Sequence, residues 1–206
     1  MTLEEWLKYH QNNLHFKQKY RGIQMMKNPF DLIIYEELIS KIKPDIIIEI
    51  GTSQGGFALW LADRLKLYTK NGKVVTIDLE KAGKENIEKF NYDNIISIIG
   101  DCNSLEVINK AKENISESDV VLVIEDSAHT PENTLKVLNN FKDSVTIGSY
   151  LIVEDSICDV LKIEFMPGPL EAIEKWIKNN GNYLIDRSCE KYIITYNPKG
   201  YLKRKE

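Results

Sequence analysis

The chain has 206 residues, 43% of them hydrophobic and 28% charged, with a formal net charge of −4. This size and composition are typical of one globular domain with or without a small extension, and the acidic balance argues against nucleic acid as the main partner. No apolar run approaches the about 20 residues of a transmembrane helix, and the acidic N-terminal stretch does not resemble a signal peptide. Three scattered cysteines show neither metal-ligand nor disulfide spacing, which favours reduced thiols and a cytoplasmic protein.

Helices and strands are predicted to alternate along most of the chain. An aromatic preface over residues 1–22 is expected to be helical, and the next helix should end at Ile42, because a residue preceding a proline such as Pro44 disfavours helix. Apolar, β-branched runs predict strands at Ile46–Ile50, 72–78, Ile95–Gly100, Asp119–Glu125 and Gly148–Val153. Helical spacing predicts helices at Asp31–Ile42, Phe57–Leu67, Lys81–Phe90, Ser104–Asn114 and Pro131–Phe141, and a last one from Leu170.

This alternation predicts an α/β fold with a mostly parallel, doubly wound, Rossmann-like sheet. The last stretch, YLIDRSCEKYIITYNPKG, predicts two further strands joined by a turn near Ser188, which would form a C-terminal antiparallel hairpin. We expect residues 1–30 to form a helical extension and residues 31–206 to form the main domain. The aromatic preface could pack on this domain or on a second copy of the chain, so a homo-oligomer stays open.

The stretch from Pro44 to Asp63 predicts a strand, a glycine turn and a helix, which is how open α/β folds build a cofactor cradle. Its spacing is E-x-G-x-x-x-G-G, unlike the G-x-G-x-x-G of dinucleotide folds or the lysine-bearing phosphate loop. The spacing resembles motif I of the S-adenosylmethionine-dependent methyltransferases. The candidate cofactor residues here are Glu49, Gly51, Thr52, Ser53, Gly55 and Gly56. The alternative is a tight turn with no ligand.

An acidic residue follows or ends each of the later predicted strands. The carboxyl edge of a parallel sheet is where ligands bind, so we expect these acids to meet at one site. Asp78 comes 27 residues after Gly51 and is the candidate for the ribose hydroxyls of a cofactor. Asp101, followed by Cys102, suits the adenine side. The alternative for each aspartate is an N-cap, which satisfies free N–H groups of a helix.

Asp126, Glu154 and Asp155 form a second acidic group, because they follow two strands that should be neighbours. Oxygen ligands from adjacent strand ends suit a hard cation such as Mg²⁺, which would also relieve the repulsion between the carboxylates. His129 lies just beyond the same strand end and has the ordinary pKa of a general base. Its alternative role is a loop histidine at the start of the helix from Pro131.

Several segments together resemble the cephalosporin hydroxylase family, which includes the rhamnosyl O-methyltransferases. The resemblance runs from about Gly22 to Arg204, through KNPFDLIIYEELISKIKPDIIIEIGTSQGGFALWLAD, VVTIDLE, IEDSAHT, GSYLIVEDS, PGPLEAIEKWI and DRSCEKYIITYNPKGYLKR. It implies a class I fold, S-adenosylmethionine bound at Gly51–Gly56 and Asp78, and Mg²⁺ held by Asp126, Glu154 and Asp155. Glu125 precedes Asp126, and because neighbouring strand residues face opposite ways, we favour Asp126 as the metal-facing residue.

The function that these features predict is S-adenosylmethionine-dependent, Mg²⁺-assisted O-methylation of a sugar or small-metabolite hydroxyl. His129 or the metal-bound Asp126 would accept the hydroxyl proton. Acceptor contacts are expected from the preface, the FMPGP loop at 165–169, and the tail around Arg187 and Tyr196.

Two alternatives of another class remain. A non-catalytic module could bind S-adenosylmethionine or serve an assembly. An iron oxygenase of the same family is disfavoured, because it commonly needs two histidines and a carboxylate, and two of the three histidines, His10 and His15, lie far along the chain from the strand ends.

Overall fold

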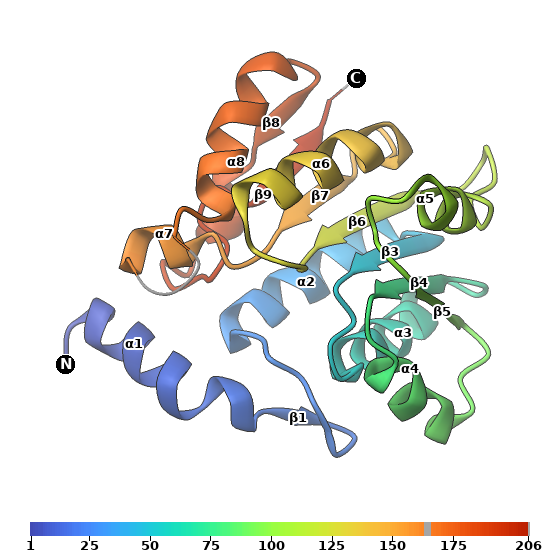
Figure 1. The fold of residues 1–206 in the computed structure, drawn as a ribbon, viewed down its shortest axis with the longest axis horizontal. Coiled ribbons are helices and arrows are strands. Elements are labelled where there is room, and N and C mark those ends of the chain that lie inside the picture. Colours follow the sequence, from blue (N-terminus) through green and yellow to red (C-terminus); the bar gives the residue numbers. More distant parts are fainter. Residues whose placement is uncertain (163–165, 206) are drawn as a thin grey trace.

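The computed structural model describes residues 1–162 and 166–205 and confirms the predicted α/β class. A seven-stranded sheet has the order β5-β4-β3-β6-β7-β9-β8 (Figure 1). The strands, in this order, are Ile95–Ile99, Lys73–Asp78, Ile46–Ile50, Val121–Glu125, Tyr150–Val153, Tyr201–Arg204 and Tyr183–Ile185. The first five in this order are paired in parallel, and β9 is antiparallel to both of its neighbours.

The order of the strands reverses between β3 and β6. From β3 the chain continues to β4 and β5 on one side, and from β6 it continues to β7 on the other. In open α/β sheets this switch point leaves a crevice at the carboxyl ends of the strands, where ligands bind.

Helices cover both faces of the sheet (Figure 1). Along β3, Ile46, Ile48 and Ile50 belong to one apolar layer and Ile47 to the other, as expected for alternating side chains. The first layer is completed by α5 (Leu105–Lys112), α6 (Pro131–Phe141) and α8 (Pro169–Trp176). The second is completed by α2 (Pro29–Ile42), α3 (Gly56–Tyr68) and α4 (Ala82–Ile87). A strand buried on both faces is mostly apolar, which is why the isoleucine run predicts β3; its one charged residue, Glu49, is also buried.

The preface is helical only in its first half. Helix α1 (Leu3–Asn13) begins at a capping box formed by Thr2 and Glu5, and a short 3₁₀ helix follows. The expectation of helix is wrong for residues 19–22, which belong to the hairpin of β1 (Lys19–Tyr20) and β2 (Ile23–Gln24). Its turn residues, Arg21 and Gly22, both have positive φ angles, of 50° and 82°, as a tight two-residue hairpin turn requires.

The second predicted C-terminal strand is also misplaced. The strand that pairs with β8 is β9, whereas residues 192–196 are irregular. Their polar groups are used elsewhere: Tyr196 donates its backbone N–H to Asp31 over 2.7 Å, and the Thr195 hydroxyl donates to the same carboxylate. This segment is therefore fixed to α2, and the hydroxyl of Tyr201 on β9 donates to the same carboxylate, which links α2 to the sheet. Helix α7 (Ile157–Leu161) completes the fold, and within the described residues no helix has the length and apolar character needed to cross a membrane.

Candidate active site

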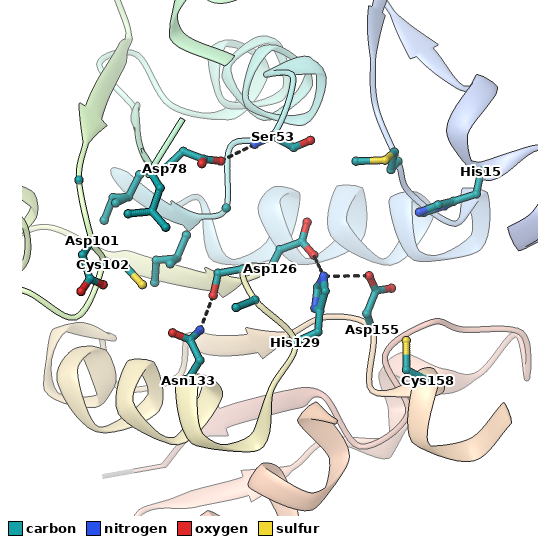
Figure 2. A pocket seen from close by; sticks show the side chains of 18 of the residues that line it. His15, Ser53, Asp78, Asp101, Cys102, Asp126, His129, Asn133, Asp155 and Cys158 are labelled. Carbon is teal, nitrogen blue, oxygen red and sulfur yellow. Dashed lines mark hydrogen bonds and ion pairs between the residues drawn. The ribbon is translucent and has the colours of Figure 1, made fainter. Parts of the chain in front are cut away.

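A cavity of about 500 Å³ opens at the carboxyl ends of β3, β4, β5 and β6, where the switch point predicts it (Figure 2). Its wall contains eight of the sequence-predicted site residues: Gly51, Ser53, Asp78, Asp101, Cys102, Asp126, His129 and Asp155. The other candidates, Glu49, Thr52, Gly55, Gly56 and Glu154, lie outside this wall.

The glycines of the turn are required by close backbone packing. Gly51 has a φ of 103°, and a Cβ there would lie 1.9 Å from the carbonyl oxygen of Asp126. A Cβ on Gly56 would lie 2.2 Å from the carbonyl oxygen of Gln24, so the N-terminal hairpin sits directly on the start of α3. Any other residue at either position would push these segments apart.

Glu49 and Thr52 lie beneath the turn rather than in the cavity. Thr76 on β4 donates its hydroxyl to Glu49 Oε2 and also shares a hydrogen bond with the Thr52 hydroxyl. Burial raises the pKa of Glu49 to about 8. Its Oε1 is buried and has no hydrogen-bond partner among the described residues, which leaves one acceptor available next to the turn.

Asp78 and Asp101 are held by backbone N–H groups, those of the glycine turn and its own turn for Asp78 and that of its own turn for Asp101. Asp78 Oδ2 accepts the N–H of Ser53 over 2.7 Å and Oδ1 accepts that of Glu80 over 2.9 Å. Asp101 is exposed and accepts the N–H of Asn103 over 2.9 Å. Asp78 therefore links β4 to the glycine turn. It also lines the cavity, so its carboxylate can reach hydroxyl groups of a ligand there.

Cys102 lines the cavity beside Asp101. Burial raises the pKa of its thiol to about 12, so it remains neutral and acts as a small apolar wall group.

The acids after β6 and β7 meet a histidine at the edge of the cavity (Figure 2). Nε2 of His129 lies 3.8 Å from Asp126 Oδ1 and 3.5 Å from Asp155 Oδ2. One ligand atom from each of the three side chains lies within 4.8 Å of the others, so the group could hold a metal ion. His129 and Asp155 have φ angles of 53° and 56°, a conformation that costs energy for residues other than glycine and that is concentrated at functional sites.

The electrostatics of this group follow from burial and mutual charge. Burial raises the pKa of Asp126 and of Asp155. Burial acts to lower the pKa of His129, but the carboxylates of Asp155 and Asp126 outweigh it, so its pKa is raised. The two carboxylates thus favour the protonated form of the imidazole.

Lys27 is the functional candidate that the sequence analysis missed. Its buried ammonium group donates to Asp126 and, over 2.8 Å, to Glu154 Oε2, and it lies 4.5 Å from the centre of the Phe57 ring. The second oxygen of Glu154 accepts the Tyr35 hydroxyl over 2.7 Å. Glu154 therefore does not join the group formed by Asp126, His129 and Asp155. The sequence offers one signal for this role: Lys27 is the only charged residue in the run MMKNPF.

Strand parity separates Glu125 from Asp126. Asp126 lines the cavity, whereas Glu125 is buried and accepts hydrogen bonds from Ser127 and, at the start of α6, from Asn133 and Thr134. Burial raises the pKa of Glu125 to about 7. It is Asp126 that faces the candidate metal group.

The N-terminal segment supplies the side of the cavity opposite Asp78. Gln11, His15, Phe16 and Met26 line it. The tail does not: Tyr196 is buried with its hydroxyl 2.7 Å from Nδ1 of His10, and Arg187 pairs with Glu190 over 2.9 Å. Of the FMPGP loop, Phe165 lies outside the described residues, and the rest is absent from the cavity wall.

Solved structures share this architecture. A Mg-SAM structure of CmcI matches 100% of this chain and 85% of its own length, with a TM-score of 0.71 at 21% identity. The O-methyltransferase TomG from Streptomyces achromogenes, in complex with SAM, matches 99% of this chain and 89% of its own, with a TM-score of 0.59 at 15% identity. The strand order and these likenesses define the fold as that of the class I methyltransferases.

The sequence comparisons narrow the class to one family. A family model described as Rhamnosyl O-methyltransferase/CmcI matches residues 12–205. A rhamnosyl O-methyltransferase from Mycobacterium bovis is 30% identical over 208 residues, covering 98% of this chain and 84% of that protein. The chain belongs to the Rhamnosyl O-methyltransferase/CmcI family.

Proposed function

We propose that this S-adenosylmethionine-dependent O-methyltransferase methylates a hydroxyl group of a sugar-containing small molecule, assisted by Mg²⁺ at Asp126 and Asp155. The observation that carries the proposal is the meeting of Asp126, His129 and Asp155 at the edge of a cavity that also contains Gly51 and Asp78. The cavity thus brings together residues that could bind the cofactor, residues that could hold a cation, and a further wall that could receive the acceptor.

The cavity suits S-adenosylmethionine in size and charge. Its volume of about 500 Å³ is in the range of small-molecule sites. Several carboxylates in its wall, among them Asp78 and Asp126, favour a cationic ligand. Asp78 keeps lone pairs for ribose hydroxyls beyond its two backbone contacts. When bound, the cofactor supplies an activated methyl group on a sulfonium, so the protein mainly has to position the reactants.

The donor set suits Mg²⁺ better than a redox metal. Mg²⁺ is commonly held by one or two carboxylates with several waters, and Asp126 and Asp155 supply two. The group has one histidine and two carboxylates, whereas iron oxygenases commonly use two histidines and one carboxylate. When bound, the ion would lower the pKa of an acceptor hydroxyl.

His129 is the proposed proton acceptor. Its Nε2 lies within 4 Å of both carboxylates, which would stabilise the imidazolium that forms when the acceptor hydroxyl gives up its proton. The N-terminal wall would receive the acceptor. Phe16 and Met26 offer apolar contact to a sugar face or an aglycone, and Gln11 and His15 offer polar atoms. The rhamnosyl name of the M. bovis relative supports a glycoside.

The test is methyl transfer to a panel of rhamnosides and other glycosides, followed by mass spectrometry, with Mg²⁺ or with EDTA. We expect at least one glycoside to gain the mass of one methylene group, with turnover that falls in EDTA and returns on adding Mg²⁺. Turnover unaffected by EDTA would contradict the metal role. Cofactor binding without turnover on any acceptor would favour a non-catalytic binding module.

A further inference from the structure

Both carboxylate oxygens of Glu154 are already occupied by donors from within the protein. Oε2 accepts from the Lys27 ammonium group over 2.8 Å, and Oε1 accepts from the Tyr35 hydroxyl over 2.7 Å. All three side chains are buried, so water does not compete for these contacts. A buried carboxylate with a cation on one oxygen and a hydroxyl on the other is fully satisfied without a ligand.

The same ammonium group also fixes Asp126. It donates to Asp126 Oδ2, whereas Oδ1 is the oxygen that lies 3.8 Å from His129. Lys27 is itself held in place over the ring of Phe57. One aspartate oxygen is thus reserved for the interior, and the other is turned to the group at the cavity edge.

Charge reinforces this division of the carboxylates. A Mg²⁺ ion bonds oxygen at about 2.0–2.1 Å, so an ion on Glu154 Oε2 would lie next to the ammonium nitrogen, and two like charges at that separation repel strongly. Asp155 differs, because its backbone turns with a φ of 56° and its carboxylate faces His129 instead of Lys27.

We propose that Lys27 is a positioning residue that reserves Glu154 for itself, so that a divalent cation is held by Asp126 and Asp155 without Glu154. The inference rests on the proposed cation site. It departs from the three-carboxylate set that the sequence resemblance implies.

The test measures Mn²⁺ affinity by electron paramagnetic resonance in the parent, Glu154→Gln and Asp155→Asn, with S-adenosylmethionine present. Glu154→Gln should change the dissociation constant less than fivefold, whereas Asp155→Asn, one residue away, should weaken it more than fivefold. A loss of fivefold or more in Glu154→Gln would overturn the inference and leave the proposed function standing. No Mn²⁺ binding to the parent, or none lost in Asp155→Asn, would overturn the proposed metal site and the inference with it.

Lys27→Met supplies a second readout that simple structural damage would not produce. Removing the ammonium group frees Glu154 and takes a positive charge away from the site, so Mn²⁺ should bind at least fivefold more tightly. Unchanged or weaker binding by the folded variant would contradict the role of Lys27. If Lys27→Met does not fold, the Glu154→Gln result decides alone, with circular dichroism as the check on folding.

Discussion

The two halves of the sheet's carboxyl edge have the same sequence signature and different structures. On the β4 and β5 side, Asp78 and Asp101 accept N–H groups from neighbouring turns. On the β6 and β7 side, the half-buried Asp126 and the buried Glu154 both accept from the ammonium group of Lys27, which lies 99 and 127 residues away in the chain. An acid after a strand therefore reports only where it lies along the sheet. Its chemistry depends on the donors that the rest of the fold brings to it, which are backbone N–H groups on one side and an ammonium group on the other.

The most severe test of this difference is to remove the ammonium group of Lys27 from the β6 and β7 side. Lys27→Met leaves Asp126 and Glu154 without their shared ammonium group, and removing one partner of a buried ion pair costs about 3–5 kcal/mol. Urea unfolding of the metal-free proteins measures this loss. Lys191→Met is the matched control, because its pair with Glu37 is exposed and its removal should change little. Equal stability of Lys27→Met and parent would show that the β6 and β7 side needs no cation.

The proposed catalytic role of the β6 and β7 side is tested at His129. His129→Gln removes the proton acceptor while keeping a polar side chain, and turnover should fall at least about 100-fold, the lower end of general-base contributions. The dissociation constant for S-adenosylmethionine should stay within threefold of the parent, as measured by calorimetry. A small loss of turnover would assign the proton to another group.

Substitutions on the β4 and β5 side should change cofactor affinity alone. Asp78→Asn keeps an acceptor for one backbone N–H but removes the charge that would bind ribose hydroxyls, so cofactor affinity should weaken about tenfold. Asp101→Asn is the control, since Asp101 is exposed and serves its own turn. Equal losses in the two variants would mean that the two aspartates share the ligand.

The smallest expected effect concerns Asp31, a buried carboxylate held by Thr195, Tyr196 and Tyr201. Burial raises its pKa to about 6 from an ordinary 3.8, so the folded chain binds this proton more tightly than the unfolded chain. Its stabilising contribution is therefore present below the ordinary pKa and is lost as the pH rises through 6. From pH 7 to pH 5 the unfolding free energy should gain on the order of 1 kcal/mol from this group. Asp31→Asn should remove that gain, and a parent and variant with the same pH dependence would contradict it.

Local sequence signals were enough for the parts of the fold that depend on local physics. The strand Ile46–Ile50 and the helix Pro131–Phe141 have the predicted bounds, because an isoleucine run must be buried and because Thr130 and Pro131 form a strong helix start. The hairpin at residues 19–24 was missed because its turn depends on Arg21 adopting a positive φ, which residue type alone does not indicate.

The parts of the site that were missed depend on long-range partners. The engagement of Glu154 by Lys27 and Tyr35 joins residues 127 and 119 positions apart, and no spacing rule connects them. The β-branched and aromatic residues at 192–196 favour a strand, yet the Thr195 hydroxyl and the Tyr196 backbone N–H donate to Asp31 instead of to a neighbouring strand. In each case a buried polar partner from a distant segment decided the outcome.

The most direct test of the central claim is calorimetric titration of S-adenosylmethionine into the metal-free protein, followed by titration of Mg²⁺ into the parent and Asp155→Asn. We expect cofactor binding in both proteins and a separate Mg²⁺ binding event that the variant loses. No cofactor binding in any condition would contradict the methyl-transfer site, and Mg²⁺ binding that is unchanged in Asp155→Asn would contradict the assignment of the metal to the β6 and β7 side.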